Sequence, residues 1–259
     1  MVVTQLVVFL TFCGTVAVTG RSQLLLVSQA EEIKLGLAEF DKLKHAIPMS
    51  QDANLNALVQ RVGRRIAAVA DADLPNAQWE FVLFDQPQTA NAFCLPGGKV
   101  GIYTGILPIT KNEGGLATVI AHEVAHAVTR HGAERISEGL LIHLGGKALD
   151  AAMKTNSERT RAIALAAYGL GSTVGIELPH SRKHELEADH IGLIYMARAG
   201  YDPREAIEFW KRFGAYSRQK GGLSLEFLST HPLDQTRIAQ LESLLPKAME
   251  EYRKTLTRQ

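Results

Sequence analysis

The chain has 259 residues, of which 46% are hydrophobic and 21% charged, and this balance excludes a chain that is disordered throughout. Its 28 basic and 27 acidic residues give a net charge of +1, which favours neither a nucleic-acid partner nor binding to an anionic membrane surface. The two cysteines, Cys13 and Cys94, are too few for a disulfide scaffold or a four-thiolate zinc site. Any metal site must therefore be built from histidines and carboxylates.

The N-terminal segment is apolar from Gln5 to Val18 apart from threonine and glycine. It is shorter than the about 20 residues that span a bilayer, and it has the length of a signal-peptide core, although no Lys or Arg precedes Arg21. The sequence around Cys13 resembles a bacterial lipoprotein cleavage site, although Phe12 stands where a small residue is usual. We expect residues 1–20 to be a signal peptide or lipoprotein anchor. The alternative is a buried N-terminal strand or helix.

This expectation implies an exported protein in the periplasm or cell envelope, associated with a membrane through a lipid at Cys13. Stable anchoring would need the several acyl chains of a lipoprotein, because one chain binds reversibly. Residues 21–259 are predicted to form a single domain.

The first half of the domain is predicted to mix helices and strands. Apolar periodicity predicts a helix over residues 29–45 and a second from the N-cap Ser50 to residue 69. Residues 79–84 are rich in strand formers, and residues 90–95 and 99–103 flank a Pro-Gly-Gly turn, which predicts a β-hairpin.

The second half is predicted to be helical. The expected segments are 112–135, 140–153, 162–176, 181–200, one that begins at Asp202–Pro203 and one that begins at His231–Pro232. The predicted fold class is therefore mainly α with a small antiparallel β-sheet (α+β). Residues 140–176 are expected either to fold over a cleft as a lid or to pack as ordinary helices.

A metal-binding pattern lies inside the predicted helix 112–135. His122 and His126 are four residues apart and thus share one helix face, with Glu123 beside them. This is the HExxH spacing, in which two imidazoles bind zinc and the glutamate acts as general base. The surrounding residues are apolar, where such side chains are costly unless they are paired or bound to metal. The alternative is a pair of core histidines satisfied by hydrogen bonds.

A third ligand is expected from the helix that begins at Ser181. Glu185 and Asp189 share one face of it, so Glu185 can ligate while Asp189 hydrogen-bonds a ligand histidine. Glu187 lies on another face and is expected to be solvated. Without the HExxH pattern, this segment would be taken for a charged surface helix.

His231 precedes Pro232 at an expected helix start, where the helix dipole favours a neutral ring. Such a ring can donate to a developing oxyanion or ligate a metal; the alternative is a surface N-cap. We assign the remaining histidines to surface or core positions, with His180 and His184, which flank the expected site, as the candidates for exception; the set includes His131, His143, His180, His184 and His190.

Taken together, these motifs resemble those of the gluzincin metallopeptidases of the CAAX prenyl endopeptidase and HtpX family, in its soluble exported bacterial branch. The resemblance rests on the segments 91–93, 96–98, 103–105, 122–126, 181–189 and 230–232. It implies a zincin-type peptidase domain that binds one Zn²⁺ per chain. It further implies that His122, His126 and Glu185 are the zinc ligands, that Glu123 is the catalytic base, that Asp189 supports a ligand histidine, and that His231 lies near the metal.

The expected function is a zinc-dependent endopeptidase that cleaves unfolded or flexible protein segments in cell-envelope quality control. A substrate is expected to lie extended along the strand that contains Asn91, Ala92 and Phe93, adding to the sheet by backbone hydrogen bonds. Cys94 on the same strand is expected to be a small apolar side chain without a nucleophilic role. The alternatives are a zinc-containing peptide-binding or chaperone-like protein with little or latent proteolytic activity, and a helical structural protein with a fortuitous motif.

Overall fold

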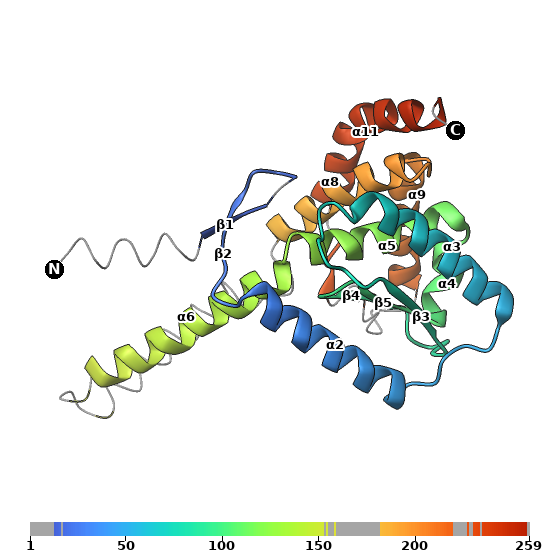
Figure 1. The fold of residues 1–259 in the computed structure, drawn as a ribbon. Coiled ribbons are helices and arrows are strands. Elements are labelled where there is room, and N and C mark those ends of the chain that lie inside the picture. The colour runs from blue at the N-terminus through green and yellow to red at the C-terminus, as the bar shows by residue number, and fades with distance from the viewer. Residues whose placement is uncertain are drawn as a thin grey trace.

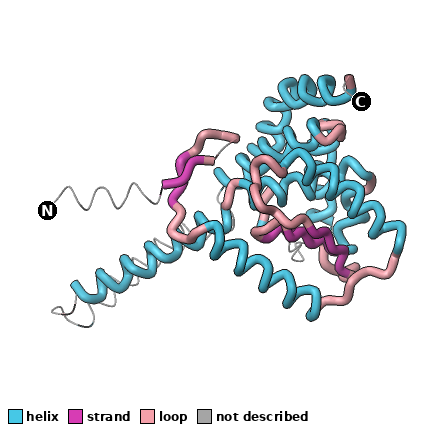
Figure 2. The backbone as a smooth tube through the Cα atoms, in the orientation of Figure 1, coloured by secondary structure: helices cyan, strands magenta, loops and turns pink. Residues whose placement is uncertain are grey.

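The computed structural model of the chain describes residues 13–16, 18–152, 154, 158, 182–219, 227, 230–233 and 235–257 (Figure 1). Helices dominate, and the strands form two small sheets (Figure 2). The predicted class, mainly α with a small β component, is confirmed. None of the described helices has the length and apolarity needed to cross a membrane.

The elements follow one another in this order: β1 Cys13–Thr15, β2 Ser22–Leu24, α2 Gln29–Ala46, α3 Ala53–Ala70, β3 Glu80–Phe84, β4 Ala92–Leu95, β5 Lys99–Tyr103, η1 Thr104–Ile106, α4 Leu107–Thr110, α5 Glu113–Val128, α6 His131–Ala152, α8 Arg182–Arg198, α9 Arg204–Gln219 and α11 Gln235–Leu256. The two N-terminal helices match the prediction within a few residues, except that Asp52 rather than Ser50 caps α3 through hydrogen bonds from two backbone amides.

The main sheet has the strand order β3-β5-β4. The hairpin of β4 and β5 is antiparallel, as predicted, but β3 pairs parallel to β5. The sheet is therefore mixed rather than antiparallel throughout. After β3 the chain passes to the opposite edge of the sheet, forms β4 there, and returns as β5 between the two. β4 ends up as an edge strand of this sheet, facing the helix that carries the HExxH pattern.

The sheet lies between α2 on one face and α3 with α5 on the other (Figure 1). On the α2 face, Phe40 meets the rings of Phe84 and Phe93 edge-on at 6.5 and 6.2 Å between centroids. On the other face, Phe81, Leu83, Val100 and Ile102 join the main core. The alternation of side chains along each strand thus supplies both faces with apolar contacts.

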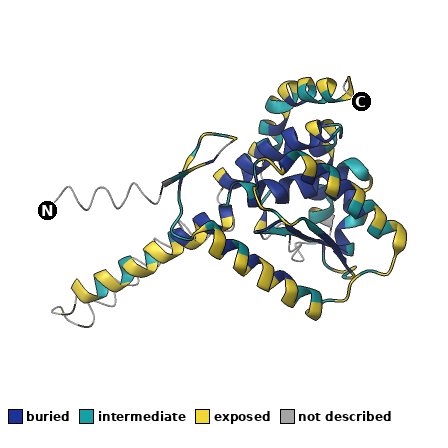
Figure 3. Cartoon of the chain, viewed as in Figure 1, coloured by how far each residue is buried: buried dark blue, intermediate teal, exposed yellow. Residues whose placement is uncertain are grey.

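The central helix α5 is buried from Gly115 to Ala127 (Figure 3). It begins at Asn112, whose side chain accepts a hydrogen bond from the Gly115 amide at 2.7 Å. It ends at Val128, because Arg130 adopts a left-handed conformation with φ of 57° and α6 starts anew at His131. The predicted single helix 112–135 is therefore two helices, and the break lets the His131 ring turn back toward α5.

Two further expectations differ from the structure or fall outside it. The last helix begins at Gln235, so His231 lies in a bend several residues before it rather than at its start. The lid expectation for 140–176 lies mostly outside the described residues; the part that belongs to α6, up to Ala152, extends away from the core (Figure 1).

The N-terminal ribbon, which we define as β1, β2 and the turn between them, is an antiparallel pair with Cys13 opposite Leu24. The turn is closed by a 2.8 Å hydrogen bond from the Val16 amide to the Arg21 carbonyl. Thr19 and Arg21 reach from it to α6 and α8. Residues at and just after the end of the predicted anchor segment therefore contact the helical body of the molecule.

Candidate metal centre

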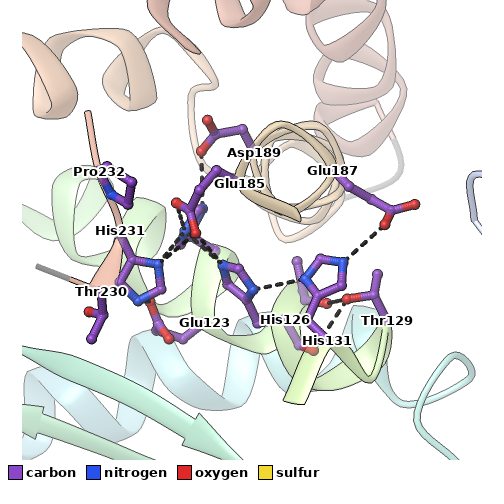
Figure 4. Close-up of polar contacts among 12 residues, drawn as sticks. Glu123, His126, Thr129, His131, Glu185, Glu187, Asp189, Thr230, His231 and Pro232 are labelled. Atoms are coloured by element: carbon purple, nitrogen blue, oxygen red, sulfur yellow. Dashed lines mark hydrogen bonds and ion pairs between the residues drawn. The ribbon is translucent and has the colours of Figure 1, made fainter. Parts of the chain in front are cut away.

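Four buried side chains from three separate segments converge beside α5. They are His122, His126, Glu185 and His231, and one ligand-type atom of each lies within 4.8 Å of the others. The Nε2 atoms of the two α5 histidines are 3.1 Å apart. Glu185 Oε2 lies 3.3 Å from His122 Nε2. Glu185 Oε1 lies 3.3 Å from His126 Nε2 (Figure 4). The structure thus brings together both imidazoles and the carboxylate that the sequence motifs singled out.

His231 completes the cluster from the bend before α11. Its Nδ1 lies 3.1 Å from Glu185 Oε1 and 3.3 Å from His122 Nε2. Its Nε2 lies 3.4 Å from Oε1 of Glu123. The ring is held from behind by Phe227, whose centroid is 4.6 Å away. His231 is thus buried against the cluster, and the surface N-cap interpretation is wrong.

Close packing of α8 on α5 brings Glu185 to the histidines. At Gly192 the helices approach so tightly that a Cβ would lie 3.1 Å from the backbone nitrogen of His122. Glu185 precedes Gly192 by seven residues, or about two helical turns, and so points toward the same helix.

A charged pair supports His122 on the side away from the cluster. Asp189 Oδ1 lies 3.0 Å from His122 Nδ1, and Arg237 binds both Asp189 oxygens at 2.7 Å. Arg237 also contacts Glu185 at 2.9 Å and lies over the Trp210 ring, 3.9 Å from its centroid. Asp189 therefore occupies the predicted position beside a histidine, and Arg237 is a further member that no sequence signal identified.

His126 has a different support. Its Nδ1 lies 2.8 Å from Nδ1 of His131, and His131 Nε2 lies 2.9 Å from Glu187 Oε2 (Figure 4). Glu187 is 7% exposed and His131 is fully buried. The expectation of a solvated Glu187 is wrong because the N-terminal ribbon covers that face of α8.

Burial and neighbouring groups shift the pKa values of ionisable groups in the cluster. Burial alone would raise the pKa of the Glu185 carboxyl, but the imidazoles of His122, His126 and His231 around it lower that pKa far below its usual range. Burial likewise opposes protonation of His122, yet Asp189 and Glu185 raise its pKa to about 9. Burial raises the pKa of Glu123, the group nearest the open side.

The Glu187 carboxylate beside His131 is charged, and the His131 ring is neutral. Burial lowers the pKa of His131 to about 4. Burial alone would raise the pKa of Glu187, but hydrogen bonds from His131, Thr19 and Arg21 lower it to about 2. Cys94 is not activated, since burial raises the pKa of its thiol.

A cavity of about 250 Å³ opens beside the cluster. Its lining includes Glu123, His126 and His231 on one side and the edge strand from Asn91 through Ala92 and Phe93 to Leu95 on the other. The predicted substrate strand and the predicted base therefore face the same space.

The donor set fits a divalent cation. Imidazole nitrogens and a carboxylate are ordinary zinc ligands, and three such groups with an open side are typical of catalytic sites. Glu123 Oε1 is buried and has no hydrogen-bond partner among the described residues. A buried acceptor needs a hydrogen-bond donor, and a water or a substrate bound at the metal-loaded site would supply one.

Comparison with known proteins identifies the family. Residues 53–245 match the model of peptidase family M48. The chain belongs to peptidase family M48. It is thereby a metalloendopeptidase, the enzyme class that the motifs predicted.

The curated relatives of this M48 chain carry matching names. It is 34% identical over 94% of its length to the mitochondrial metalloendopeptidase OMA1 of Saccharomyces cerevisiae, of which it covers 72%. It is 42% identical over 73% of its length to the protein of the same name from Schizosaccharomyces pombe, of which it covers 53%. A putative β-barrel assembly-enhancing protease of Vibrio cholerae is 30% identical over 80% of this chain, which covers 43% of that protein.

These names correct the predicted location. The resemblance to gluzincin peptidases holds at the level of the family, but its exported bacterial branch is not supported. Three relatives that are 34 to 42% identical are named as mitochondrial proteins, which contradicts an exported, periplasmic or cell-envelope protein with a lipid at Cys13. The error arose because a short apolar segment followed by cysteine is a weak pattern that unrelated N-termini share.

Proposed function

We propose that the chain is a zinc-dependent endopeptidase in which His122, His126 and Glu185 hold one Zn²⁺ and Glu123 acts as general base. One observation carries the proposal: the two histidines and Glu185 converge within hydrogen-bond range while Glu123 faces the cavity beside them. A bound zinc ion would polarise the scissile carbonyl and lower the pKa of the attacking water.

Glu123 handles the protons of the reaction. Its carboxylate takes a proton from the attacking water and passes it to the leaving amine. The raised pKa of this buried carboxyl suits both steps, because a group that gains and loses a proton in one cycle works best with a pKa near the working pH. His231, in the same wall of the cavity, either donates to the oxyanion or adds a ligand.

The substrate lies along β4. An edge strand presents unpaired backbone groups to which an extended peptide can add as a further strand. Asn91, Ala92 and Phe93 at the start of this edge line the cavity next to Glu123, so the added peptide would pass the base. Only a segment that can become extended fits this mode, which favours unfolded or flexible protein chains as substrates. We place the enzyme in protein quality control on this ground.

Replacing Glu123 with glutamine tests the mechanism. Glu123→Gln keeps the shape of the side chain and is expected to retain stoichiometric zinc while casein cleavage falls about 10²- to 10⁴-fold. The matched control is Glu113→Gln, a partly exposed glutamate on the first turn of the same helix, which should cleave normally. A variant that cleaves casein like the parent, or a parent without stoichiometric zinc, contradicts the proposal.

A second candidate is a zinc-containing peptide-binding protein with latent activity. It is favoured by His231, whose Nδ1 lies close enough to the cluster to close it with a fourth ligand, as in structural zinc sites. His231→Ala separates the two. Cleavage that appears only in this variant supports latency, whereas a loss of cleavage supports a catalytic His231.

A further inference from the structure

The support of His126 extends into a buried network that joins α5, α6, α8 and the N-terminal ribbon. Arg21 of the ribbon binds Glu187 at 2.7 Å through Nε and Glu134 at 2.7 Å through both terminal nitrogens. Thr19 donates to the other oxygen of Glu187. Each carboxylate in turn bonds one histidine: Glu187 bonds His131 and Glu134 bonds His184 at 3.0 Å. The two rings stack at 4.2 Å between centroids.

The two arms of this network differ in one respect. The arm through Glu187 and His131 continues to His126, whose Nε2 faces the metal cluster. The arm through Glu134 and His184 joins α6 to α8. Both carboxylate–histidine pairs bind Arg21, but only the Glu187–His131 pair contacts a candidate metal ligand. The Glu134–His184 pair can therefore serve as an internal control.

Counting protons along the first arm assigns the tautomer of His126. A carboxylate only accepts, so the proton between Glu187 and His131 sits on His131 Nε2. The 2.8 Å contact between Nδ1 of His131 and Nδ1 of His126 needs one proton between them, and because Glu187 holds the His131 proton on Nε2, that proton sits on Nδ1 of His126. This leaves Nε2 of His126 with its lone pair directed at the cluster, which is the form a metal requires.

We infer that His131 and Glu187, held in place by Arg21 of the N-terminal ribbon, are positioning residues that set the tautomer of His126. The inference rests on the proposed role of His126 as a metal ligand. It makes the ribbon part of the outer support of the metal centre, although Arg21 is more than 100 positions from His126 in sequence. Metal affinity then depends on docking of the ribbon.

Zinc affinity of single-residue variants tests the inference. Glu187→Gln removes the charge that holds the proton on His131, and His131→Phe removes the relay while filling the same space. Both are expected to weaken Zn²⁺ binding, measured by competition with a chelator, about 10- to 100-fold. Arg21→Gln should weaken it in the same direction, and Arg21→Lys by less, because lysine keeps the charge but not the two-sided geometry.

Glu134→Gln is the matched control. It removes an equally buried carboxylate from the same arginine but leaves the path to His126 intact. Its zinc affinity should stay within about threefold of the parent, below the change expected when a support of a ligand is lost. Equal weakening in Glu134→Gln and Glu187→Gln would overturn the inference, since it would indicate a general loss of packing.

A second measurement needs no metal. Long-range ¹H–¹⁵N spectra of the metal-free protein report which nitrogen of His126 carries the proton. We expect Nδ1–H in the parent and in Glu134→Gln, and loss of that preference in His131→Phe. An Nε2–H tautomer in the parent overturns the inference even if zinc binds. A parent that binds no zinc but shows Nδ1–H overturns the proposed function and leaves the tautomer assignment standing.

Discussion

At the scale of single residues, the cluster depends on where protons sit. His122 is oriented by a carboxylate that is itself held by a bidentate arginine, and His126 by a second histidine. Both arrangements turn the Nε2 atom of a histidine toward Glu185. Because these groups are buried in a low-dielectric interior, their hydrogen bonds are strong, and a change in one partner alters the protonation or orientation of the next.

Asp189→Asn should expose this dependence. The asparagine side chain has no charge and only one acceptor oxygen. It therefore cannot accept a hydrogen bond from His122 Nδ1 and also bind Arg237 through two oxygens, so the proton is no longer fixed on His122 Nδ1. We expect zinc affinity to fall about 10- to 100-fold. Chelator competition measures it, with Asp73→Asn, whose carboxylate bonds Tyr195 elsewhere, as the control. Unchanged zinc affinity in Asp189→Asn would show that this carboxylate does not support the site.

At the scale of elements, the distance between α5 and α8 decides whether Glu185 meets the histidines. The helices touch through Gly192, where backbone atoms of Ala121 and His122 surround the position that a Cβ would take. Backbone of a buried helix cannot move aside as a flexible side chain can, so added volume must push α8 outward.

Gly192→Ala is therefore expected to lower stability by about 1–3 kcal/mol and to weaken zinc binding, because Glu185 moves with α8. Gly139→Ala is the matched glycine on α6: it is exposed, and its Cβ would meet no described atom within 4 Å. That variant should gain about 0.5–1 kcal/mol from its higher helix propensity. Denaturant unfolding measures the free energy of unfolding of both variants. An unchanged value for Gly192→Ala would mean that the α5–α8 interface has room for the added methyl group.

At the scale of the whole molecule, Arg21 joins three segments that are far apart in the chain. It pairs with Glu134 on α6 and Glu187 on α8, and both carboxylates are nearly inaccessible. Burial alone would raise the pKa of Glu134 from its usual 4.5, but hydrogen bonds from His184 and Arg21 lower it to about 2. A lowered pKa means that the ion pair stabilises the fold above pH 4.5 and stops doing so as pH falls toward 2.

Glu134→Gln should reveal this contribution. We expect the variant to be less stable than the parent at pH 7 by about 1–2 kcal/mol, a figure discounted for solvent screening. The gap should narrow as the pH falls from 4.5 toward 2, because the Glu134 carboxylate of the unfolded parent takes up a proton in this range while that of the folded parent stays charged until about pH 2. Thermal unfolding across this range measures it, and a gap independent of pH would assign the effect to packing instead.

The sequence by itself determined the parts that depend on local periodicity. His122, Glu123 and His126 lie together because residues four apart share a helix face whatever surrounds the helix. The β4–β5 hairpin followed from its Pro-Gly-Gly turn, and the helix of Glu185 and Asp189 from its spacing. Each of these patterns is complete within about 20 residues of chain.

The tertiary structure decided what depends on segments distant in sequence. The pattern of a helix shows which face is apolar, but not whether a distant segment will cover one of its polar faces. Glu187 was therefore expected in solvent, although the N-terminal ribbon buries it. The left-handed residue Arg130, which turns His131 toward His126, carries no local signal such as glycine. Arg237 became part of the site only through the packing of α11 on α8, because burial of a charge requires partners that only the folded chain brings together.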